Sequence, residues 1–369
     1  MKILFLVSSM HGGGAERVAA TLASAWARRG DEVMLVSCYS GRGHCDQQLD
    51  PGVRLVWLAD RMGGPTWLRP VSKLWALRRL TREFRPDRVL SFLTNVSVTA
   101  LLALRGLGLP VVVSERTDPA YGDDVLEPAL KWLRRLTYPW ALRVAVQTPQ
   151  SVPHLQKVVP GAKRVAVVAN PLPDGLPPAR RQEPRTDRCM LAALGRFNSV
   201  KQFDRLIEVF AQLADRFPHW DLWIWGDGPE RAGYQRRVDA LGLQDRIHMP
   251  GFSRTPWDDL QRAHGFVLNS RVEGFPNALL EAMALGLPCV AVDCPSGPAE
   301  LTRNGQDATL VPLGDERALS AALARLMQAT PAEREAWGAA AAASVRGRYG
   351  LETILKSWDA AWGEDGKNG

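Results

Sequence analysis

Short apolar runs alternate along this chain with amphipathic stretches of helical period. Such alternation predicts strand–helix units in which parallel strands are buried on both faces by helices. In the first part of the chain the predicted strands are residues 2–8, 32–37, 88–92, 110–114, 143–147 and 164–168. In the second part they are residues 190–194, 222–225, 247–249, 266–270 and 289–293.

Helices are predicted between these strands from apolar positions three and four residues apart. The first part contains predicted helices at residues 18–29, 67–85, 96–104 and 125–140. The second part contains residues 203–217, a helix ending near residue 241, one beginning at Asn277, and residues 318–327, 331–345 and 349–362.

A change of composition separates the two parts. Residues 171–188 are rich in proline and charge, which is typical of a domain linker. We therefore predict an α/β protein with two Rossmann-like, doubly wound domains, residues 1–170 and 189–348, that face each other across a cleft. Residues 349–369 are expected to pack back on the first domain as a helix. The cleft is the expected ligand site.

Length and composition agree with this organisation. A chain of 369 residues with 46% hydrophobic content is long enough for two cores. No apolar run reaches the roughly 18 residues that a membrane-spanning helix needs, and the first run is too short for a secretory signal. Five scattered cysteines without CxxC pairs predict reduced thiols in a cytosolic protein.

The positive charge is concentrated in the first domain. Residues 1–170 hold 23 Lys and Arg against 13 Asp and Glu, whereas the remainder holds 23 against 26. A basic half could face anionic lipid, nucleic acid or a phosphorylated substrate. No nucleic-acid-binding motif or basic–aromatic repeat is present, so nucleic acid is not expected as a partner.

The predicted helix at residues 67–85 has an apolar stripe and a basic side. Its basic side carries Arg78, Arg79, Arg82 and Arg85. An ordinary surface helix with its apolar face in the core is the favoured interpretation. The alternative is that the basic side, with Trp67 before it, rests on an anionic membrane.

Residues 271–286 contain the most informative stretch for chemistry. Glu273 and Glu281 flank a predicted helix start at Pro276 and Asn277, with seven residues between the two acids. The N-terminus of a helix favours a phosphate, and a carboxylate beside it suits ribose or sugar hydroxyls. The stretch therefore predicts a nucleotide-sugar site. The alternative is an ordinary strand–loop–helix with two solvated acids.

Further loops follow predicted strands, where open α/β sheets bind ligands. Arg196 and Lys201 could neutralise a diphosphate, and a glycine loop begins at Gly226. The first loop, residues 11–17, is glycine-rich but is not GxGxxG. The second strand ends without an acid, which argues against a dinucleotide dehydrogenase. Residues 115–119 form a charged cluster that is either a binding site or a salt-bridged loop.

These motifs together resemble the GT-B glycosyltransferases of family 4, which retain configuration at the anomeric carbon. The resemblance spans nearly the whole chain. It is carried by Gly-Gly-Gly-Ala-Glu-Arg-Val at residues 12–18, Gly-Arg-Phe with Lys201 at residues 195–201, Gly-Asp-Gly-Pro at residues 226–229, and the E-x7-E pair Glu273 and Glu281. The forms at residues 13–18 and 114–119 resemble members that extend lipid-linked or lipopolysaccharide glycans, often from UDP-sugars.

The resemblance implies roles for residues of the second domain. Arg196 and Lys201 would hold the donor diphosphate and stabilise the leaving group. Glu281 would bind the ribose hydroxyls and Glu273 the donor sugar. The remaining implied donor contacts are Gly226, the backbone of Gly274, Phe275, Pro276 and Asn277, and, near the base, Met249, Gly251 and Phe252.

The first domain is implied to contribute as well. Gly13 and Gly14 would approach the diphosphate. Many relatives carry a histidine where this chain has Glu115 and Arg116, so Arg116 or His11 could serve in its place at the sugar or acceptor. The other histidines, among them His154 and His264, lack metal-ligand spacing and are expected to be mostly structural.

The activity implied is transfer of a hexosyl or N-acetylhexosaminyl unit from a nucleotide sugar, with UDP favoured, to a glycan or lipid-linked glycan acceptor. Such enzymes serve bacterial surface polysaccharide, lipopolysaccharide or glycoprotein synthesis. A same-face mechanism needs no protein nucleophile. The chain lacks Asp-x-Asp, so neither a metal nor another cofactor is expected. The protein is expected in the cytoplasm, where it could lie on the inner face of the membrane.

Two alternatives remain open. A sugar-nucleotide epimerase or a phosphorylase would keep the fold and change the reaction. A non-enzymatic module would bind a nucleotide or an anionic lipid without catalysis.

Overall fold

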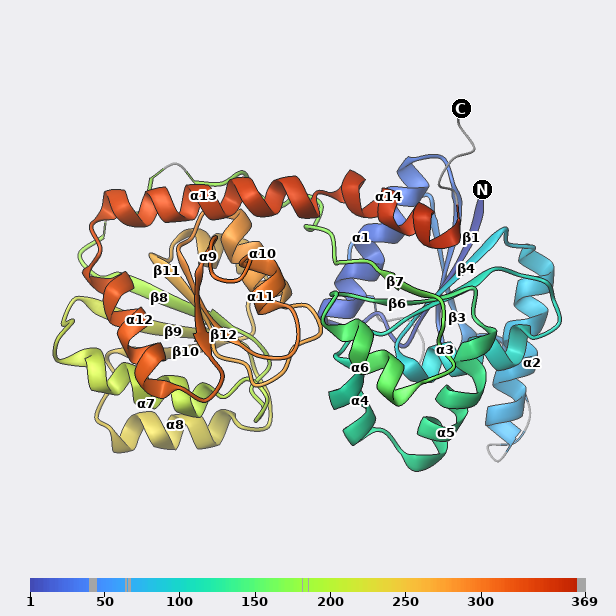
Figure 1. Ribbon diagram of the computed structural model, residues 1–369, viewed down its shortest axis with the longest axis horizontal. Coiled ribbons are helices and arrows are strands. Elements are labelled where there is room, and N and C mark those ends of the chain that lie inside the picture. The colour runs from blue at the N-terminus through green and yellow to red at the C-terminus, as the bar shows by residue number, and fades with distance from the viewer. Residues whose placement is uncertain (40–44, 64, 66–67, 181, 185, 364–369) are drawn as a thin grey trace. The chain divides into compact units, whose positions relative to one another are not determined.

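The structure is a computed structural model that describes residues 1–39, 45–63, 65, 68–180, 182–184 and 186–363, without the side chains of residues 122–124. The chain divides into two compact units (Figure 1). Unit 1 comprises Met1–Asp174 together with Leu351–Gly369, and unit 2 comprises Gly175–Gly350. The division at residues 174 and 175 lies within the predicted linker. Linker residues 181 and 185 and C-terminal residues 364–369 lie outside the described residues.

Unit 1 is built on a seven-stranded sheet in which all pairings are parallel. Its strand order is β3-β2-β1-β4-β5-β6-β7. The strands are β1 (Lys2–Val7), β2 (Glu32–Ser37), β3 (Val53–Trp57), β4 (Arg88–Phe92), β5 (Val111–Ser114), β6 (Arg143–Val146) and β7 (Val165–Val167). Strand β3, a partly exposed edge strand, was not among the strands predicted from the sequence.

Helices cover both faces of this sheet. Alternate residues of β1 face opposite sides, so Leu4 and Leu6 join the core with α2 and α3, while Phe5 packs on Trp26 of α1. The helices are α1 (Gly14–Arg28), α2 (Arg69–Phe84), α3 (Thr94–Leu104), α4 (Pro119–Val125), α5 (Pro128–Thr137), α6 (Ser151–Val158) and α14 (Leu351–Trp362), with short 3-10 turns η1 (Leu58–Arg61) and η3 (Tyr138–Trp140).

Three helix predictions in unit 1 need correction. The single helix expected at residues 125–140 is wrong: α4 ends at Val125, α5 begins at Pro128, and a 3-10 turn follows. Pro128 at the first helical position favours a new start rather than a continuation. Helix α1 begins at Gly14 rather than Val18, since the Gly13 carbonyl already accepts the Arg17 amide. Helix α2 begins at Arg69, and Trp67 lies outside the described residues.

The last helix, α14, is an integral part of the unit 1 core. Trp358 is fully buried, close to the rings of Phe92 and Trp362. On the same helix Asp359 forms ion pairs with Arg29 at 2.6 Å and with Arg88 at 3.1 Å. The C-terminal segment therefore packs into unit 1 against residues from the first hundred positions of the chain.

Unit 2 contains a six-stranded parallel sheet of order β10-β9-β8-β11-β12-β13. Its strands are β8 (Cys189–Leu194), β9 (Trp220–Trp225), β10 (Ile247–Gly251), β11 (Gly265–Leu268), β12 (Cys289–Asp293) and β13 (Thr309–Pro312). Its helices are α7 (Phe203–Ala214), α8 (Arg231–Ala240), α9 (Pro256–Gln261), α10 (Asn277–Ala284), α11 (Pro298–Leu301), α12 (Glu316–Gln328) and α13 (Pro331–Tyr349). Strand β13 and the short helices α9 and α11 were not predicted.

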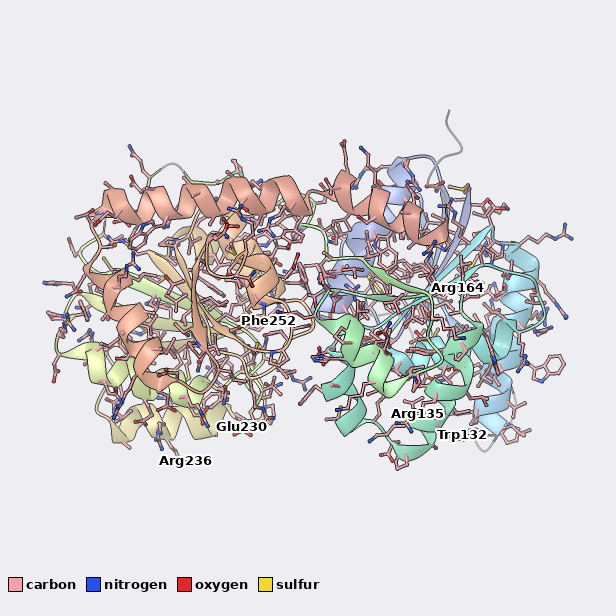
Figure 2. All side chains as sticks on the ribbon, viewed as in Figure 1. Trp132, Arg135, Arg164, Glu230, Arg236 and Phe252 are labelled. Carbon is pink, nitrogen blue, oxygen red and sulfur yellow. The ribbon has the colours of Figure 1, made fainter. Side chains whose placement is uncertain are left out.

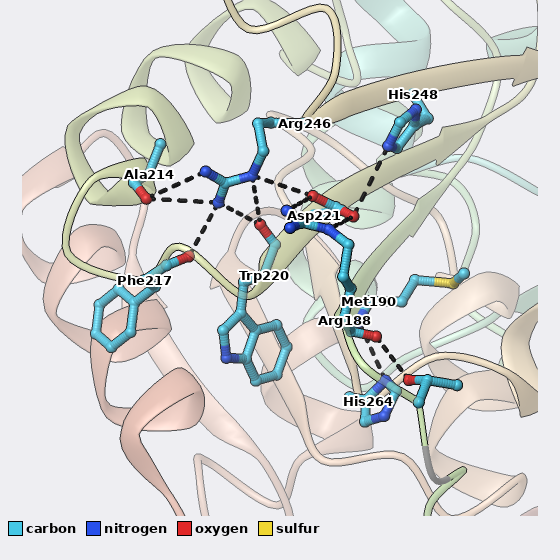
Figure 3. A network of polar contacts seen from close by, with 10 residues as sticks. Arg188, Met190, Ala214, Phe217, Trp220, Asp221, Arg246, His248 and His264 are labelled. Atoms are coloured by element: carbon cyan, nitrogen blue, oxygen red, sulfur yellow. Dashed lines mark hydrogen bonds and ion pairs between the residues drawn. The ribbon is translucent and has the colours of Figure 1, made fainter.

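A polar network fixes the amino ends of the central strands in unit 2 (Figure 3). Asp221 is buried and accepts two hydrogen bonds from Arg188, at 2.6 and 2.7 Å, and one from Arg246 at 3.1 Å. The ring of His264 accepts the Met190 amide at Nδ1, and its Nε2 lies 3.0 Å from the Pro184 carbonyl. These residues lie at the strand ends opposite the candidate site, so their role is structural.

The predicted fold class, two doubly wound parallel-sheet α/β units, is confirmed by this architecture. Among the helices of the described ranges, none has both the length and the apolar character to cross a bilayer.

Candidate functional site

The candidate site in unit 2 lies where the strand order reverses, between β8 and β11. Strand β8 pairs with β9 on one side and with β11 on the other, so the loops after β8 and β11 leave the same edge and diverge. Open α/β sheets bind ligands at such a switch point. These two loops carry Arg196 and Lys201, and Glu273, respectively.

The structure brings Lys201 and Glu273 into direct contact. The Lys201 Nζ lies 2.5 Å from the Glu273 Oε1, and the two side chains are 21% and 12% exposed. The loops are joined by their backbones as well, since the Arg271 amide donates to the Val200 carbonyl at 2.8 Å. A cation and an acid that the sequence assigned separate roles therefore form one ion pair.

Arg196 is held differently from Lys201. Within the described part of the chain its exposed side chain makes no hydrogen bond or ion pair, but the residue after it is an anchor. Phe197 is fully buried, packs edge-to-face on Phe203 and Tyr234, and its amide donates to the Asp227 carbonyl. This anchor fixes the Arg196 backbone while the guanidinium stays available.

The glycine loop at Gly226 packs directly on the Arg196 loop. Gly226 has a φ of +139°, and a Cβ there would lie 1.9 Å from the Gly195 carbonyl oxygen. A Cβ at Gly228 would lie 2.4 Å from the Phe197 carbonyl oxygen. Only glycine allows these backbones to meet. The motif at residues 226–229 therefore has a structural function that is visible without any ligand.

Helix α10 and its preceding loop form the other side of the site. The loop is held by the Glu273 amide, which donates to the Pro295 carbonyl, and by the Ser296 amide and hydroxyl, which donate to the Glu273 and Gly274 carbonyls. Phe275 is buried, and Pro276 is the residue just before the first turn of α10. The unpaired amides of the first helical turn point away from the start of a helix. The start of α10 follows Glu273 by four residues, so these amides lie close to Glu273 in the chain.

Glu281 lies one turn inside α10 and is 1% exposed. Its Oε2 accepts a hydrogen bond from the Trp257 Nε1 at 2.8 Å. A buried carboxylate is costly unless it is well paired, and the hydroxyl groups of a ligand are of a type that it could also accept. Trp257 had no signal in the sequence, because only the fold brings α9 to α10.

The proposed base-binding stretch follows an irregularity in β10. The register between β10 and β9 shifts between His248 and Gly251. The Met249 carbonyl accepts a hydrogen bond from Arg231 at 2.7 Å, and the Gly251 carbonyl accepts the Gly226 amide at 2.8 Å. Phe252 is 70% exposed at the end of this stretch (Figure 2). An exposed aromatic ring there is suited to stacking on a flat base.

In unit 1, the glycine loop is held at the carboxyl end of β1. The Gly12 amide donates to Asp46 at 2.8 Å, and the His11 Nδ1 lies 4.0 Å from the same carboxylate. Glu16 folds back over Gly13, where a Cβ would lie 2.3 Å from its Oε2. Gly14 is the first residue of α1. The loop therefore presents the start of a helix.

Glu115 and Arg116 follow β5 but have different surroundings. The Glu115 carboxylate is buried and accepts hydrogen bonds from Tyr138 at 2.6 Å and Thr94 at 2.9 Å, with Arg134 3.7 Å away. These contacts make Glu115 part of the scaffold in this structure, and a contact with the acceptor stays a prediction.

Arg116 is a buried cation without a carboxylate partner in the described residues. Its guanidinium stacks on Phe92 at 4.0 Å and donates to Asn170. Burial lowers the pKa of Arg116 to about 9, because the charged form loses hydration. A strongly perturbed cation at a strand's carboxyl end is a functional-site candidate.

One pair in unit 1 was not foreseen. The His154 Nδ1 lies 2.8 Å from the Asp118 carboxylate, which is almost fully buried and also accepts the Ala120 amide. The sequence placed Asp118 in the charged cluster but gave no reason to connect it with His154, 36 residues later. Strand adjacency in the fold creates this pair.

The described residues contain no group of three His, Cys, Asp or Glu side chains arranged to hold a metal ion. That the reaction needs no metal stays a prediction. The joint use of both units by one donor likewise stays a prediction.

Comparison with known proteins shows the family of the chain. Residues 178–344 match the family model described as glycosyl transferases group 1, and residues 13–171 match the glycosyl transferase 4-like domain. The two models together cover most of the chain, which belongs to the GT4-type glycosyltransferases.

Two full-length relatives support the assignment. The lipopolysaccharide core biosynthesis glycosyltransferase LpsD of Rhizobium meliloti is 27% identical over 366 residues, which cover 94% of each chain. A GalNAc-alpha-(1->4)-GalNAc-alpha-(1->3)-diNAcBac-PP-undecaprenol alpha-1,4-N-acetyl-D-galactosaminyltransferase of Campylobacter jejuni is 26% identical over 327 residues, 87% of each chain.

A third match is partial. An exopolysaccharide phosphotransferase of Streptomyces coelicolor is 34% identical over 204 residues, which are 55% of this chain and 21% of that protein.

Among solved structures, a TarM mutant from S. aureus in complex with fondaparinux, alpha-GlcNAc-glycerol and UDP has a TM-score of 0.82 at 11% identity, covering 98% of this chain and 99% of that one. The predicted GT-B fold is thereby confirmed.

Proposed function

We propose that this glycosyltransferase moves a hexosyl or N-acetylhexosaminyl unit, with retention, from a UDP-sugar to a glycan or lipid-linked glycan in bacterial surface polysaccharide, lipopolysaccharide or glycoprotein synthesis. The observation that carries the proposal is the gathering of Lys201, Glu273 and Glu281 around the start of α10. Cations and helix amides suit a diphosphate, while carboxylates suit hydroxyl groups.

Charge development explains the arrangement. As the bond from the anomeric carbon to the phosphate oxygen breaks, its electron pair passes to the leaving diphosphate. Arg196, Lys201 and the first amides of α10 would stabilise this charge, which is usually the largest single contribution to catalysis. The acceptor hydroxyl attacks on the same face and gives its proton to the departing phosphate oxygen, so no protein nucleophile is needed.

The ion pair gives Lys201 and Glu273 a shared role. With donor bound, the Lys201 ammonium would keep one hydrogen bond to Glu273 and give another to the diphosphate, since an ammonium has three donors. Glu273 would thus orient the cation and accept a hydroxyl of the donor sugar with its remaining lone pairs. Glu281, held by Trp257, would accept the ribose hydroxyls.

The remaining contacts are proposed on the same basis. Gly274, Phe275, Pro276 and Asn277 would seat the sugar and phosphate by their backbones, while Met249, Gly251 and Phe252 would contact the base, with Gly226 beside them. From unit 1, Gly13 and Gly14 would approach the diphosphate. Arg116 or His11 would act near the sugar or acceptor.

Relatives inform the choice of substrate. The printed name of the Campylobacter relative specifies a saccharide on undecaprenyl pyrophosphate, and the TarM structure holds UDP. We infer the same classes here: a uridine nucleotide as leaving group and a lipid-linked acceptor reached from the cytoplasm. We further propose that no metal is required.

The test is a thermal-shift screen with UDP, GDP and ADP and their sugars, because a ligand stabilises only the state that binds it. We expect the largest increase in Tm with UDP compounds and no loss of it in EDTA. Glu281→Gln should weaken this shift. A protein indifferent to every nucleotide sugar would contradict the proposal. Donor-only NMR separates transfer from epimerisation, because an epimerase converts the donor without an acceptor.

A further inference from the structure

Unit 1 contains a pocket at the amino ends of β5, β6 and β7. Its volume is about 790 Å³, which is in the range of small-molecule sites. The lining residues that precede these three strands are Leu109, Pro110, Ala141, Leu142, Lys163 and Arg164. Arg116 of the candidate site follows the carboxyl end of β5. The pocket and Arg116 therefore lie at opposite ends of the same strand.

Part of the lining is aromatic and apolar. Tyr138, Pro139 and Trp140 of η3 line the pocket, together with Leu142. The Arg105 guanidinium stacks on Trp140 at 3.8 Å, so a positive charge lies beside the ring. A flat ring of a ligand would pack favourably here, because aromatic pairs attract one another beyond the effect of the area that they bury.

The pocket is also basic. Lys163 and Arg164 line it and are exposed, and Arg164 is the last residue before β7 (Figure 2). Within the described ranges, none of Lys163, Arg164 and Arg105 pairs with a carboxylate, and the pocket lining includes neither Asp nor Glu. An anion that enters the pocket would therefore meet cations that no acid of the described chain neutralises.

Close contacts fix the walls of the pocket. The Tyr138 hydroxyl donates to the buried Glu115 carboxylate at 2.6 Å. A Cβ at Gly161 would lie 2.7 Å from the Pro139 ring, so the turn before β7 packs tightly on η3. In that turn the Lys163 amide donates to the Gly161 carbonyl at 3.0 Å. The pocket is therefore preformed, as small-molecule sites usually are.

We propose that this pocket binds a soluble aromatic phosphate, a molecule in which a flat ring carries a phosphate group. The ring packs against Pro139 and Trp140, and the phosphate accepts hydrogen bonds from Lys163 and Arg164. Cations without acidic neighbours favour an anion, and the aromatic wall favours a ring over a bare inorganic ion. Nucleoside phosphates belong to this class of ligand.

The proposal goes beyond the proposed function and does not depend on it. The site for the donor is proposed on the loops of unit 2, whereas this pocket lies within unit 1. The experiment measures binding without donor sugar or acceptor, so the pocket and the transferase activity can fail separately.

The test is isothermal titration calorimetry of the full chain with 4-nitrophenyl phosphate, 4-nitrophenol or inorganic phosphate. We expect 4-nitrophenyl phosphate to bind at least roughly tenfold more tightly than either fragment, because its ring and its phosphate both contribute. Lys163→Glu with Arg164→Glu should weaken this binding at least roughly tenfold, the loss expected for one charge-assisted hydrogen bond. Trp140→Leu, which removes the ring and keeps an apolar side chain, should weaken it about threefold.

Matched controls lie on unit 2. Arg236→Glu with Arg317→Glu makes the same charge change at exposed positions. Arg196→Ala with Lys201→Ala removes the two cations that are proposed to hold the donor diphosphate. Both pairs should bind 4-nitrophenyl phosphate as the unmodified chain does.

Several outcomes would overturn the proposal. They are an absence of binding, equal affinity for 4-nitrophenyl phosphate and inorganic phosphate, unchanged binding after Lys163→Glu with Arg164→Glu, and an equal loss in either control pair. A lipid headgroup is another source of phosphate. Binding of phosphatidylglycerol vesicles through Lys163 and Arg164, without binding of 4-nitrophenyl phosphate, would assign the pocket to lipid and also overturn the proposal.

Discussion

At the scale of single residues, Lys201 carries the clearest chemical information. It is the one lysine between Gly175 and Gly350, a segment rich in arginine. Its contact, Glu273, lies 72 residues further along the chain. Lysine presents a compact charge on a flexible stem, whereas arginine presents a planar fork. The use of lysine here indicates a position with room for one point charge.

Lys201→Arg and Lys201→Ala are therefore both expected to lower kcat/KM for glycosyl transfer by roughly 10²- to 10³-fold, the loss typical of removing one donor to a developing anion. The measurement is steady-state kinetics with the donor identified by thermal shift. Arg205→Ala, which removes a surface pair with Glu316 at 3.6 Å, is the control and should leave the kinetics unchanged. Full activity of Lys201→Arg would contradict the proposed role of the ammonium.

At the scale of elements, the loops of unit 2 depend on close backbone packing. Gly226→Ala would place a methyl group 1.9 Å from the Gly195 carbonyl oxygen at a positive φ. We expect a loss of about 3 kcal/mol in the free energy of unfolding, from overpacking and backbone strain together. Urea unfolding measures the change.

Gly233→Ala provides the matched control for that substitution. Gly233 lies inside α8, and a Cβ there would meet no atom closer than 3.8 Å. Because alanine favours helix more than glycine does, this variant should gain about 0.5–1 kcal/mol. Equal effects at the two glycines would refute the argument from loop packing.

The amino ends of the unit 2 strands should give a pH dependence through His264. Burial lowers the pKa of this ring from its ordinary value of 6.5. Below about pH 6.5 the His264 ring is protonated in the unfolded chain and still neutral in the folded chain. The free energy of unfolding therefore decreases as the pH is lowered from 6.5 to the pKa of the folded state. Stability from this group is therefore present above pH 6.5 and lost in mildly acid solution.

His264→Gln keeps a donor and an acceptor for Pro184 and Met190 but cannot titrate. We expect it to lose less stability than the unmodified chain between pH 7.5 and 5.5, as measured by urea unfolding at both pH values. The same loss in both proteins would show that His264 does not contribute.

At the scale of the whole molecule, unit 1 is formed by two separate parts of the chain, Met1–Asp174 and Leu351–Gly369. Trp358 of α14 is fully buried close to Phe92 of β4. Trp358→Ala should therefore destabilise unit 1 by about 3–5 kcal/mol, the usual cost of emptying such a site.

Hydrogen exchange resolves this effect by unit. Amides of β1 and β4 should lose protection in Trp358→Ala, while those of β8 and β9 should keep theirs, because the two units have separate cores. Lys356→Ala, an exposed change on the same helix, should alter neither set. Loss of protection in β8 would count against separate cores.

The sequence by itself determined the fold class and the identity of the chemical groups. Buried strands such as β1 and β12 appear as apolar runs, because a parallel strand covered on both faces has few polar positions. The prediction did not include β3, a partly exposed edge strand, or the division of residues 125–140, where proline and turn geometry compete with helical periodicity. Motif spacing predicted a nucleotide-sugar site at Arg196, Lys201, Glu273 and Glu281.

Only the tertiary structure decided which of these groups meet. The Lys201–Glu273 pair, the Trp257 contact with Glu281 and the Asp118–His154 pair join segments distant in sequence. Local propensity acts over a few residues, whereas these contacts depend on strand order and on loops that share one sheet edge. Sequence periodicity specifies what each element buries, and packing specifies what each element touches.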